Sequence, residues 1–500
     1  MNLVDMLQRN ARKFAGRDCL RQGGSGITYA QVARDSARAA GLLQSWGVAR
    51  GDKVAIMSLN TPAFVHAFFG GQLCGAAVVP INHKLTAPEV DYILGHSEAK
   101  VCLFDGALAP VAEKLAHACK KASLDTAVAG VPHFDALLSG APEPLPVPLE
   151  DHDLAEILYT SGTTGKPKGC LHTHRNVIMA GITGAMAMKM DQHDRLLMAM
   201  PIWHSSPLNN WFMGALYMGA TTVLLREYHP LHLLHAVQDE RCTVYFGAPI
   251  SYLAPLQMVP TFAGFDLSSM RCWIYGGGPI SAEVARRLMD AYKSDRFYQV
   301  YGMTEAGPTG TTLFPEEQIE RAGSIGRTAL PGADIRVVKA DGSPARPGEA
   351  GEIWLKADSM MNGYFKDEAA TLAAFSERWY KTGDVVRVDE AGYLYIVDRT
   401  KDMIVTGGEN VYSKEVEDAL ASHPQVVEAA VIGRPNPEWG ETVVAVVVPA
   451  RDADLSEESL KEHLAARLAK YKIPREFRLV EALPHTPTGK VMKYKLREEI

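Results

Sequence analysis

The sequence predicts an α/β protein with a large N-terminal domain and a small C-terminal domain. Three observations support this. The 500 residues exceed what one hydrophobic core usually holds. Helix and strand patterns alternate from the N-terminus, and short strands with turns replace them between residues 323 and 396. We expect two βαβ-type subdomains and a small β-barrel-like subdomain in residues 1–399, followed by a mobile α/β domain in residues 400–500.

The first subdomain begins with a helix pattern at residues 28–47, where Thr28 can cap the start and a glycine ends the run. A second helix is expected from Pro62. Buried strands are expected at "DKVAIMS", "GAAVVPI" and "KVCLFD" (residues 52–58, 75–81 and 100–105). This alternation is typical of a parallel sheet covered by helices.

A proline-rich connection, Ser139–Glu150, leads into a second α/β run that extends to about Tyr301. In the stretch "DIRVVKADGSPARPGEAGEIWLK", Asp-Gly and Pro-Gly turn signals separate alternating strands, which predicts the β-rich unit. The final unit contains the strand patterns "VEAAVIG" and "TVVAVVVPA". We find no internal repeat at the periods of solenoid proteins.

Bulk composition is that of an ordinary globular protein, with 47% apolar and 22% charged residues and a net charge of −7. No general attraction to nucleic acid is therefore expected, although Lys and Arg dominate between Lys461 and Arg497. The cysteines are scattered without a CxxC pair, which predicts reduced thiols in a cytoplasmic protein. They are Cys19, Cys74, Cys102, Cys119, Cys170, Cys242 and Cys272.

The N-terminus has an amphipathic helix pattern with Leu3, Met6 and Leu7 on one side. It lacks the apolar central run of a secretory signal. Its basic residues would also suit an organelle transit peptide, but Asp5 and the direct passage into folded sequence argue against one. No apolar run approaches 18 residues, so no membrane-spanning segment is expected.

A polar loop follows the buried strand pattern "AEILY", in the stretch "LYTSGTTGKPKGC" (Leu158–Cys170). Gly162 and Gly165 allow backbone N–H groups to turn toward an anion, hydroxyls add donors, and two lysines add charge. The loop is not a Walker A motif, because Pro167 stands where that motif needs its second glycine. A flexible surface turn is the alternative interpretation.

Four motifs together resemble the adenylate-forming superfamily of acyl-CoA synthetases, luciferases and peptide-synthetase adenylation domains. In order they are the loop from Thr160 to Gly169, "YGMTEAG", "YKTGDV…DRTKDMIVTGGENVY" and "LPHTPTGKVMK". They extend from Tyr159 to Lys493. The overall character of the sequence is similar to that of bacterial fatty-acid or aryl-acid CoA ligases. The resemblance implies that the α-phosphate of ATP is attacked by a carboxylate, giving acyl-AMP and pyrophosphate, and that the acyl group then passes to CoA.

The resemblance implies Mg²⁺, ATP and CoA as cofactors and co-substrates. It assigns Tyr301 to adenine stacking, Thr304 to the α-phosphate and Glu305 to Mg²⁺, although a Thr-Glu pair could also simply cap a helix. The complete expected ATP- and AMP-binding set is Thr160, Ser161, Gly162, Thr163, Thr164, Gly165, Lys166, Lys168, Gly276, Gly277, Gly278, Pro279, Gln299, Tyr301, Gly302, Thr304, Asp384 and Arg399.

Asp384 would accept hydrogen bonds from the ribose hydroxyls, with Arg399 as a second ribose or phosphate contact; a turn aspartate and a surface ion pair are the simpler interpretations. Lys490 would bridge the carboxylate and the α-phosphate as a catalytic residue. Lys401 lies at the position of the family's hinge, and Gly407 and Gly408 would let the pantetheine of CoA pass. The catalytic set is Lys490, Thr304, Glu305 and His204.

For the acid, the resemblance points to a pocket with His204, Trp211, Tyr245 and Gly302. The stretches expected to line this pocket are residues 204–211, 245–249, 276–279 and 301–309. They contain no Arg or Lys that could bind a second carboxylate and no evident Asp that could bind an α-amino group. Dicarboxylic acids and amino acids are therefore disfavoured as substrates. A monocarboxylic acid remains. A fatty acid is favoured over an aryl or hydroxycinnamic acid because the overall sequence resembles that of bacterial fatty-acid CoA ligases.

Two other functions are weighed against a CoA ligase. An adenylating enzyme could load a separate carrier protein, but the sequence shows no attached carrier domain or pantetheine site. A catalytically inactive binding protein is disfavoured because the motif residues are intact. Small molecules are the expected partners, not nucleic acid, and a homodimer is left open.

Overall fold

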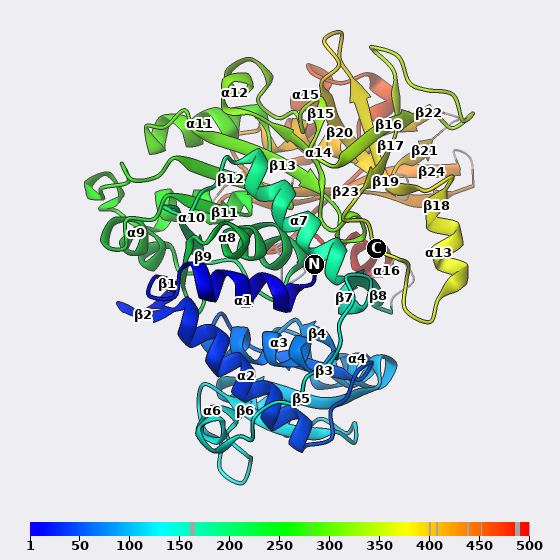
Figure 1. Cartoon of the computed structure of the whole chain (residues 1–500). Helices are drawn as coiled ribbons and strands as arrows, with labels where there is room; N and C mark the ends of the chain where they lie inside the picture. Colours follow the sequence, from blue (N-terminus) through cyan, green and yellow to red (C-terminus); the bar gives the residue numbers. More distant parts are fainter. Residues whose placement is uncertain are drawn as a thin grey trace.

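The computed structural model describes residues 1–160, 166–278, 280–399, 402–406, 409–437, 440–451, 453–485 and 491–499. Within these ranges the strands form four sheets. The two largest are mainly parallel and lie in the N-terminal part of the chain (Figure 1). Serine 161 to glycine 165, Pro279, Lys401, the glycine pair 407–408 and Lys490 lie outside the described residues, and so do the functions expected of them.

The first parallel sheet has six strands in the order β6-β5-β3-β4-β7-β8, and only β7 and β8 pair antiparallel. Its strands are β3 (Lys53–Met57), β4 (Ala77–Ile81), β5 (Ala99–Asp105), β6 (Lys120–Leu124), β7 (Leu154–Thr160) and β8 (Lys168–Thr173). The three strands expected from the sequence in the first subdomain are therefore confirmed.

The second sheet has nine strands in the order β15-β14-β13-β12-β11-β9-β10-β1-β2, with a parallel centre and antiparallel edges. These are β1 (Asp18–Gln22), β2 (Ser25–Thr28), β9 (Arg195–Met198), β10 (Thr221–Leu224), β11 (Val244–Gly247), β12 (Cys272–Gly276), β13 (Phe297–Gly302), β14 (Gly310–Leu313) and β15 (Thr328–Ala329). Because β1 and β2 join this sheet and β3 belongs to the first sheet, the N-terminal part of the chain contributes strands to both parallel sheets.

The two smaller sheets follow. One is antiparallel and is formed by β16 (Ala333–Val338), β17 (Ala350–Ala357), β18 (Phe375–Ser376), β19 (Trp379–Val388) and β20 (Leu394–Arg399). The other contains β21 (Ile404–Thr406), β22 (Glu409–Val411), β23 (Val426–Asn436), β24 (Gly440–Pro449) and β25 (Glu476–Leu479). They correspond to the expected β-rich subdomain and C-terminal α/β unit.

Helices of the N-terminal part lie between and outside the parallel sheets (Figure 1). They are α1 (Leu3–Lys13), α2 (Tyr29–Ser45), α3 (Pro62–Leu73), α4 (Ala87–Ser97), α5 (Ala109–Ala112), α6 (Phe134–Leu137), α7 (His174–Ala187), α8 (Met213–Met218), α9 (Pro230–Asp239), α10 (Pro249–Met258), α11 (Ala282–Tyr292) and α12 (Pro315–Arg321). The later helices are α13 (Glu368–Ala374), α14 (Ser413–Ala421), α15 (Glu457–Ala465) and α16 (Lys493–Glu499).

Short single-turn and π-helical segments complete the backbone. They are η1 (Gly106–Leu108), η2 (Leu138–Gly140), η3 (Ser206–Phe212), η4 (Phe262–Gly264), η5 (Thr304–Ala306) and η6 (Lys470–Lys472). Of these, η3 is a π-helix that continues directly into α8. Such segments often occur at functional sites.

Local sequence rules explain the helix starts. Thr28 caps α2 and forms a capping box with Gln31, as its sequence predicts. Asn2 caps α1 in the same way, and the apolar face of α1 is buried. The helix expected from Pro62 also forms, with Thr61 as its cap.

The largest core cluster lies between the two parallel sheets. It combines apolar side chains of α1, α2, α3, α7 and α8 with side chains of the strands on either side. A second cluster, rich in Tyr, Trp and Phe, packs β11–β13 against α9, α10 and α11. The C-terminal sheet has cores of its own, which supports its assignment as a separate unit.

Asn60 connects the two parallel layers. It follows β3 and is almost fully buried. Its amide nitrogen donates to the backbone oxygens of Leu225 and Met200 (3.0 Å each) and of Met198 (3.3 Å), and its oxygen accepts from the N–H of Ile202 (2.7 Å). One side chain of the first sheet thus satisfies backbone groups at the ends of two strands of the second.

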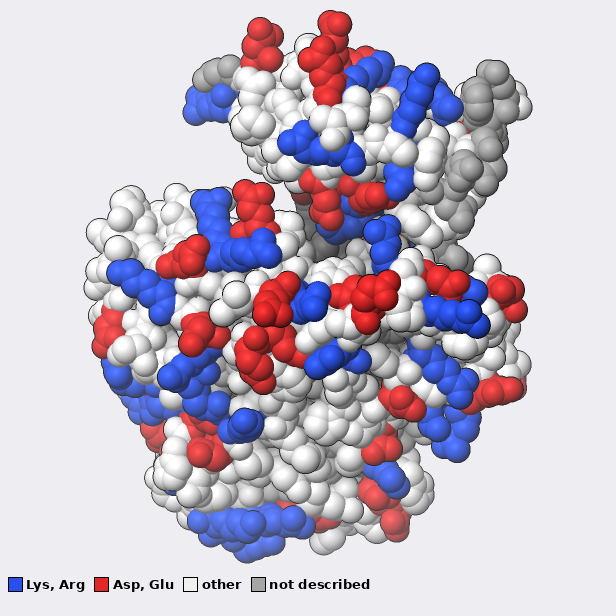
Figure 2. Space-filling model, turned by 90° about the horizontal axis from the view of Figure 1, so that it is seen from above, with Lys and Arg blue, Asp and Glu red and all other residues white. Residues whose placement is uncertain are grey.

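All seven cysteines are free thiols, as the sequence predicts, and all except the half-buried Cys119 are buried. In the described part of the chain, no helix combines the length and apolarity needed to cross a membrane. Figure 2 shows a small lobe beside a larger body, with Lys, Arg, Asp and Glu intermingled over the face in view.

We predict that Asn60→Ala lowers the free energy of unfolding by about 2–4 kcal/mol, because buried backbone groups of the second sheet lose their partner. Thermal unfolding with chemical denaturation measures the effect. Asn82→Ala is the control, since Asn82 accepts a single local bond from the N–H of Lys84 and its removal should cost less than about 1 kcal/mol. Equal losses in the two variants would contradict this role.

Candidate active site

The phosphate loop expected from the sequence is held by an antiparallel hairpin. Thr160, the last residue of β7, pairs with Lys168, the first residue of β8. The two lysines of the loop lie over aromatic rings: the Lys166 ammonium is 5.7 Å from the centroid of Tyr92, and the Lys168 ammonium is 5.1 Å from that of Tyr364. The hairpin therefore brings both positive charges to the end of the first parallel sheet.

A second group of predicted residues meets at the end of β13. The hydroxyl of Tyr301 donates a hydrogen bond to Asp384 Oδ2 (2.8 Å), and Arg399 Nε contacts Asp384 Oδ1 (3.0 Å). Asp384 and Arg399 are direct cross-strand partners on β19 and β20, which explains their proximity. Only 4% of the surface of Asp384 is exposed.

Protonation states follow from this packing. Burial, followed by the Asp384 charge, raises the pKa of the Tyr301 phenol well above its usual value, so the phenol remains a donor at neutral pH. Burial lowers the pKa of the Arg399 guanidinium, but the charges of Asp384 and its other neighbours outweigh this and raise the pKa overall. The carboxylate is thus held between a neutral donor and a permanent cation.

Thr304 and Glu305 lie directly after β13 in η5. The Thr304 hydroxyl is 2.8 Å from that of Ser205, which immediately precedes η3 and follows His204. Glu305 is 7% exposed, and its Oε1 accepts a hydrogen bond from the Tyr364 hydroxyl (3.1 Å). The sequence-predicted catalytic residues Thr304, Glu305 and His204 therefore come from two neighbouring segments.

Glycines border this region where space is limited. A Cβ atom at Gly302 would lie 2.3 Å from the backbone oxygen of Pro308, and one at Gly276 would lie 2.6 Å from that of Val300. Gly277 has φ +75°, a left-handed conformation that suits glycine. The expected Gly276–Gly278 turn begins at the last residue of β12, and Gln299 is buried on the adjacent β13. Larger residues could not maintain these close approaches.

On the acid side, the structure separates the two aromatic residues expected there. The Trp211 indole on η3 stacks on Phe246 with centroids 5.4 Å apart, and its Nε1 donates to Ser206 Oγ (3.0 Å). Tyr245, the neighbour of Phe246 on β11, is fully buried in the other aromatic cluster and packs on Tyr252. Because successive strand side chains point to opposite faces, Tyr245 is not brought together with Trp211.

Three residues near the site were not identified from the sequence. Tyr364 lies outside the four motifs, and nothing in the sequence distinguishes Ser205 as a site residue beside His204. Glu156, on β7, is fully buried, and Asn209 of η3 donates to its Oε1 (2.6 Å). The sequence signal that could have identified Glu156 is an acidic residue inside an otherwise apolar strand pattern.

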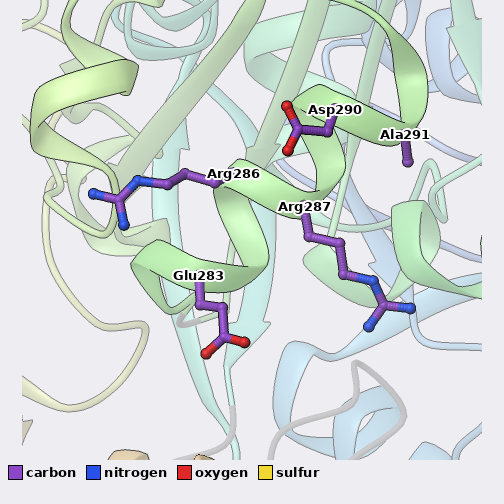
Figure 3. Close-up of a pocket in the computed structure, with 5 residues that line it drawn as sticks. All are labelled: Glu283, Arg286, Arg287, Asp290 and Ala291. Atoms are coloured by element: carbon purple, nitrogen blue, oxygen red, sulfur yellow. The ribbon is translucent and has the colours of Figure 1, made fainter.

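A depression of about 780 Å³ on the surface of α11 is unrelated to this cluster. It is lined by Glu283, Arg286, Arg287, Asp290 and Ala291. Figure 3 shows Arg286 and Arg287 pointing in different directions, so they do not converge on one anion. None of the predicted site residues that the structure describes lines it.

The donors present fit the nucleotide and the metal expected from the sequence. A buried carboxylate such as Glu305 offers the hard oxygen that Mg²⁺ prefers. Among the described residues no group of three or more His, Cys, Asp or Glu could hold a metal. Mg²⁺ is commonly bound by one or two carboxylates together with substrate phosphates, so the expected site needs no larger cluster. The fold and site together define an adenylate-forming enzyme.

Comparison with known proteins supports this class. The family model "AMP-binding enzyme" matches residues 7–365, and "AMP-binding enzyme C-terminal domain" matches residues 415–490. The chain therefore belongs to the AMP-binding enzyme family of the adenylate-forming superfamily. Since neither model covers residues 366–414, the domain boundary at residue 399 remains a prediction.

Individual relatives are CoA ligases with different acids. The chain is 38% identical over 489 residues to a feruloyl-CoA synthase of Amycolatopsis sp, covering 98% of this chain and 97% of the relative. It is 37% identical over 474 residues to a long-chain-fatty-acid–CoA ligase of Mycobacterium tuberculosis, covering 95% and 93%.

Among solved structures, the o-succinylbenzoate CoA synthetase of Bacillus subtilis, in complex with its acyl-adenylate intermediate, superposes with a TM-score of 0.88. It is 31% identical and covers 99% of this chain and 98% of that one. The chain is thus an ATP-dependent ligase of the AMP-forming acid:CoA class, and enzymes of this class use ATP, Mg²⁺ and CoA.

Burial raises the pKa of Glu156 from 4.5 to about 7. Because the folded-state pKa is above the unfolded value, the native protein loses stability as pH rises from about 4.5 to about 7, and the loss is complete above that window. We predict that Glu156→Gln, which keeps an acceptor for Asn209, removes this dependence. The variant should gain up to about 3 kcal/mol over the wild type by pH 8.

Denaturant titrations between pH 5 and 8.5 measure this difference. Glu390→Gln, an exposed change on the surface, is the control and should leave the wild-type pH profile unchanged. A Glu156→Gln profile parallel to that of the wild type would show that Glu156 does not titrate in this range.

Proposed function

We propose that this protein activates a monocarboxylic acid with MgATP to an acyl-AMP and transfers the acyl group to CoA. The observation that carries the proposal is a pair of contact groups at the end of β13: Tyr301 and Arg399 hold Asp384, and Tyr364 contacts both Glu305 and Lys168. These groups include residues of the second parallel sheet, the small antiparallel sheet and the phosphate-loop hairpin.

On the nucleotide side, Asp384 would accept hydrogen bonds from both ribose hydroxyls. Its geometry is suitable because Tyr301 and Arg399 already hold the carboxylate in one orientation, so little ordering is needed when the nucleotide binds. The Tyr301 ring would stack on adenine. The strong burial of Asp384 makes each new hydrogen bond to it stronger than it would be in water.

On the phosphate side, Lys166, Lys168 and the loop hydroxyls would bind the β- and γ-phosphates. Thr304 would donate to the α-phosphate, and Ser205 can orient that hydroxyl from the opposite segment. Glu305 would hold Mg²⁺, which when bound neutralises phosphate charge during transfer. The side chains contribute mainly positioning and electrostatic stabilisation, because two anions must meet in this reaction.

A fatty acid remains our first candidate for the carboxylic acid substrate, because the overall sequence resembles that of bacterial fatty-acid CoA ligases. An aryl acid is the second candidate, and the observation favouring it is the flat Trp211–Phe246 stack on the segment that also carries His204. Relatives with aryl and fatty acids in their names match almost equally well, so they do not favour either.

The test is incubation with ATP, Mg²⁺, CoA and a pooled panel of fatty, aryl and hydroxycinnamic acids, with thioesters identified by mass spectrometry. A series of fatty acyl-CoAs supports the first candidate, and a single aryl-CoA supports the second. AMP release without any thioester would contradict the CoA-ligase function and favour a carrier-loading enzyme. No AMP with any acid would contradict adenylation itself.

We predict that Lys490→Ala lowers the rate of acyl-AMP formation by about 10²–10³, since one preorganised donor to the reacting oxygens is lost. Thioester formation from supplied acyl-AMP should remain close to the wild-type rate. Acid-dependent exchange of labelled pyrophosphate into ATP measures the first step, and CoA thioester release measures the second. An equal loss in both steps would contradict this division of roles.

A further inference from the structure

Residues 361–365 connect two parts of the site through backbone hydrogen bonds. We call this segment the 361–365 strip. Its Asn362 N–H donates to Leu171 O (2.9 Å), the Leu171 N–H donates to Gly363 O (3.0 Å), and the Phe365 N–H donates to Gly169 O (2.7 Å). The strip therefore adds to β8, the strand that follows the phosphate loop.

The same strip contacts the segment of the expected metal ligand. The Met361 N–H donates to the backbone oxygen of Glu305 (2.9 Å). Tyr364 is a bridge partner of Cys170 on β8, so its backbone position is fixed by the strip. Its hydroxyl then reaches Glu305 Oε1 (3.1 Å), while the Lys168 ammonium lies 5.1 Å from the centre of its ring.

Tyr92 offers a comparison at the other lysine. It belongs to α4 in the first subdomain, the Lys166 ammonium lies 5.7 Å from its ring, and its hydroxyl donates to Pro167 O (3.3 Å). Its ring stacks on His96. Each lysine of the loop thus has an aromatic neighbour, but the hydroxyl of Tyr92 bonds to loop backbone, whereas that of Tyr364 bonds to a carboxylate.

We propose that Tyr364 is a positioning residue that orients Glu305 for the metal through its hydroxyl and holds Lys168 near the triphosphate through its ring. This rests on the proposed function, in which Glu305 holds Mg²⁺ and Lys168 binds phosphate. It adds a residue outside the motif stretches.

The chemistry of the phenol suits this role. Burial and then the Glu305 charge raise the pKa of Tyr364, so the hydroxyl keeps its proton and donates to the carboxylate. This hydrogen bond engages one oxygen of the Glu305 carboxylate and defines the orientation of the carboxylate. Because the donor is neutral, the carboxylate keeps its negative charge. Hydrogen bonds to metal-ligating carboxylates commonly tune metal affinity in this way.

The test separates the hydroxyl from the ring. Tyr364→Phe keeps the ring under Lys168 and removes the bond of the hydroxyl to Glu305, together with its hydrogen bond with Tyr380. We expect it to weaken Mn²⁺ binding about tenfold, measured by electron paramagnetic resonance in the presence of a non-hydrolysable ATP analogue. In pyrophosphate–ATP exchange, the apparent KM for Mg²⁺ should rise by a similar factor, with thioester formation from supplied acyl-AMP unchanged.

Tyr364→Leu removes the ring as well and should also raise the KM for ATP, a change that Tyr364→Phe should not produce. Tyr92→Phe is the matched control, because it removes the same hydroxyl at the other lysine and should leave Mn²⁺ affinity unchanged. In a Glu305→Gln background, Tyr364→Phe should cause no further loss of Mn²⁺ affinity if it acts through Glu305.

Wild-type Mn²⁺ affinity in Tyr364→Phe would overturn the proposal. A parallel fall in thermal stability and in both half-reactions would also overturn it, because that pattern indicates a general packing role. Failure of the proposed function is distinguishable, since the wild-type enzyme itself would then show no acid-dependent exchange.

Discussion

The pairing of β8 with the 361–365 strip is the constraint on which the site depends. The phosphate-loop hairpin and the segment after β17 lie far apart in the sequence, and this pairing connects them. The same segment bonds to the backbone of Glu305. Backbone hydrogen bonds fix such an arrangement more firmly than side-chain contacts, because they involve no rotamer freedom.

Much of the fold could be predicted from the sequence, because strand and helix periods are local properties. The strand before the phosphate loop, the helix capped by Thr28 and the turn-rich antiparallel unit all follow from patterns within about twenty residues. The pairing of Asp384 with Arg399 could not be derived locally, since it depends on the register of β19 against β20. Resemblance to a family supplied both residues, but not their contact.

The residues missed by the sequence share a physical reason. Tyr364 and Ser205 contact candidate site residues that are distant in sequence, namely Glu305 and Thr304. Tyr245 illustrates the opposite case: it stood in an expected pocket stretch, yet strand alternation turns it into an aromatic core while Phe246 faces Trp211. A motif identifies a segment, whereas the strand register decides which of its side chains can reach a substrate.

Tyr92 and Tyr364 also bear on how the loop exchanges its ligand. A cation–π contact at a partly exposed site is worth about 0.5–1 kcal/mol, whereas a charge-assisted bond from lysine to phosphate is worth about 1.5–3 kcal/mol. In the proposed function, a bond to phosphate would therefore outweigh the ring contact, and each lysine would turn toward the triphosphate from a position already beside it. When pyrophosphate leaves, the rings would offset part of the lost attraction, and by the same amount they would weaken phosphate binding. Two weak aromatic contacts would thus position the lysines at little cost to substrate binding.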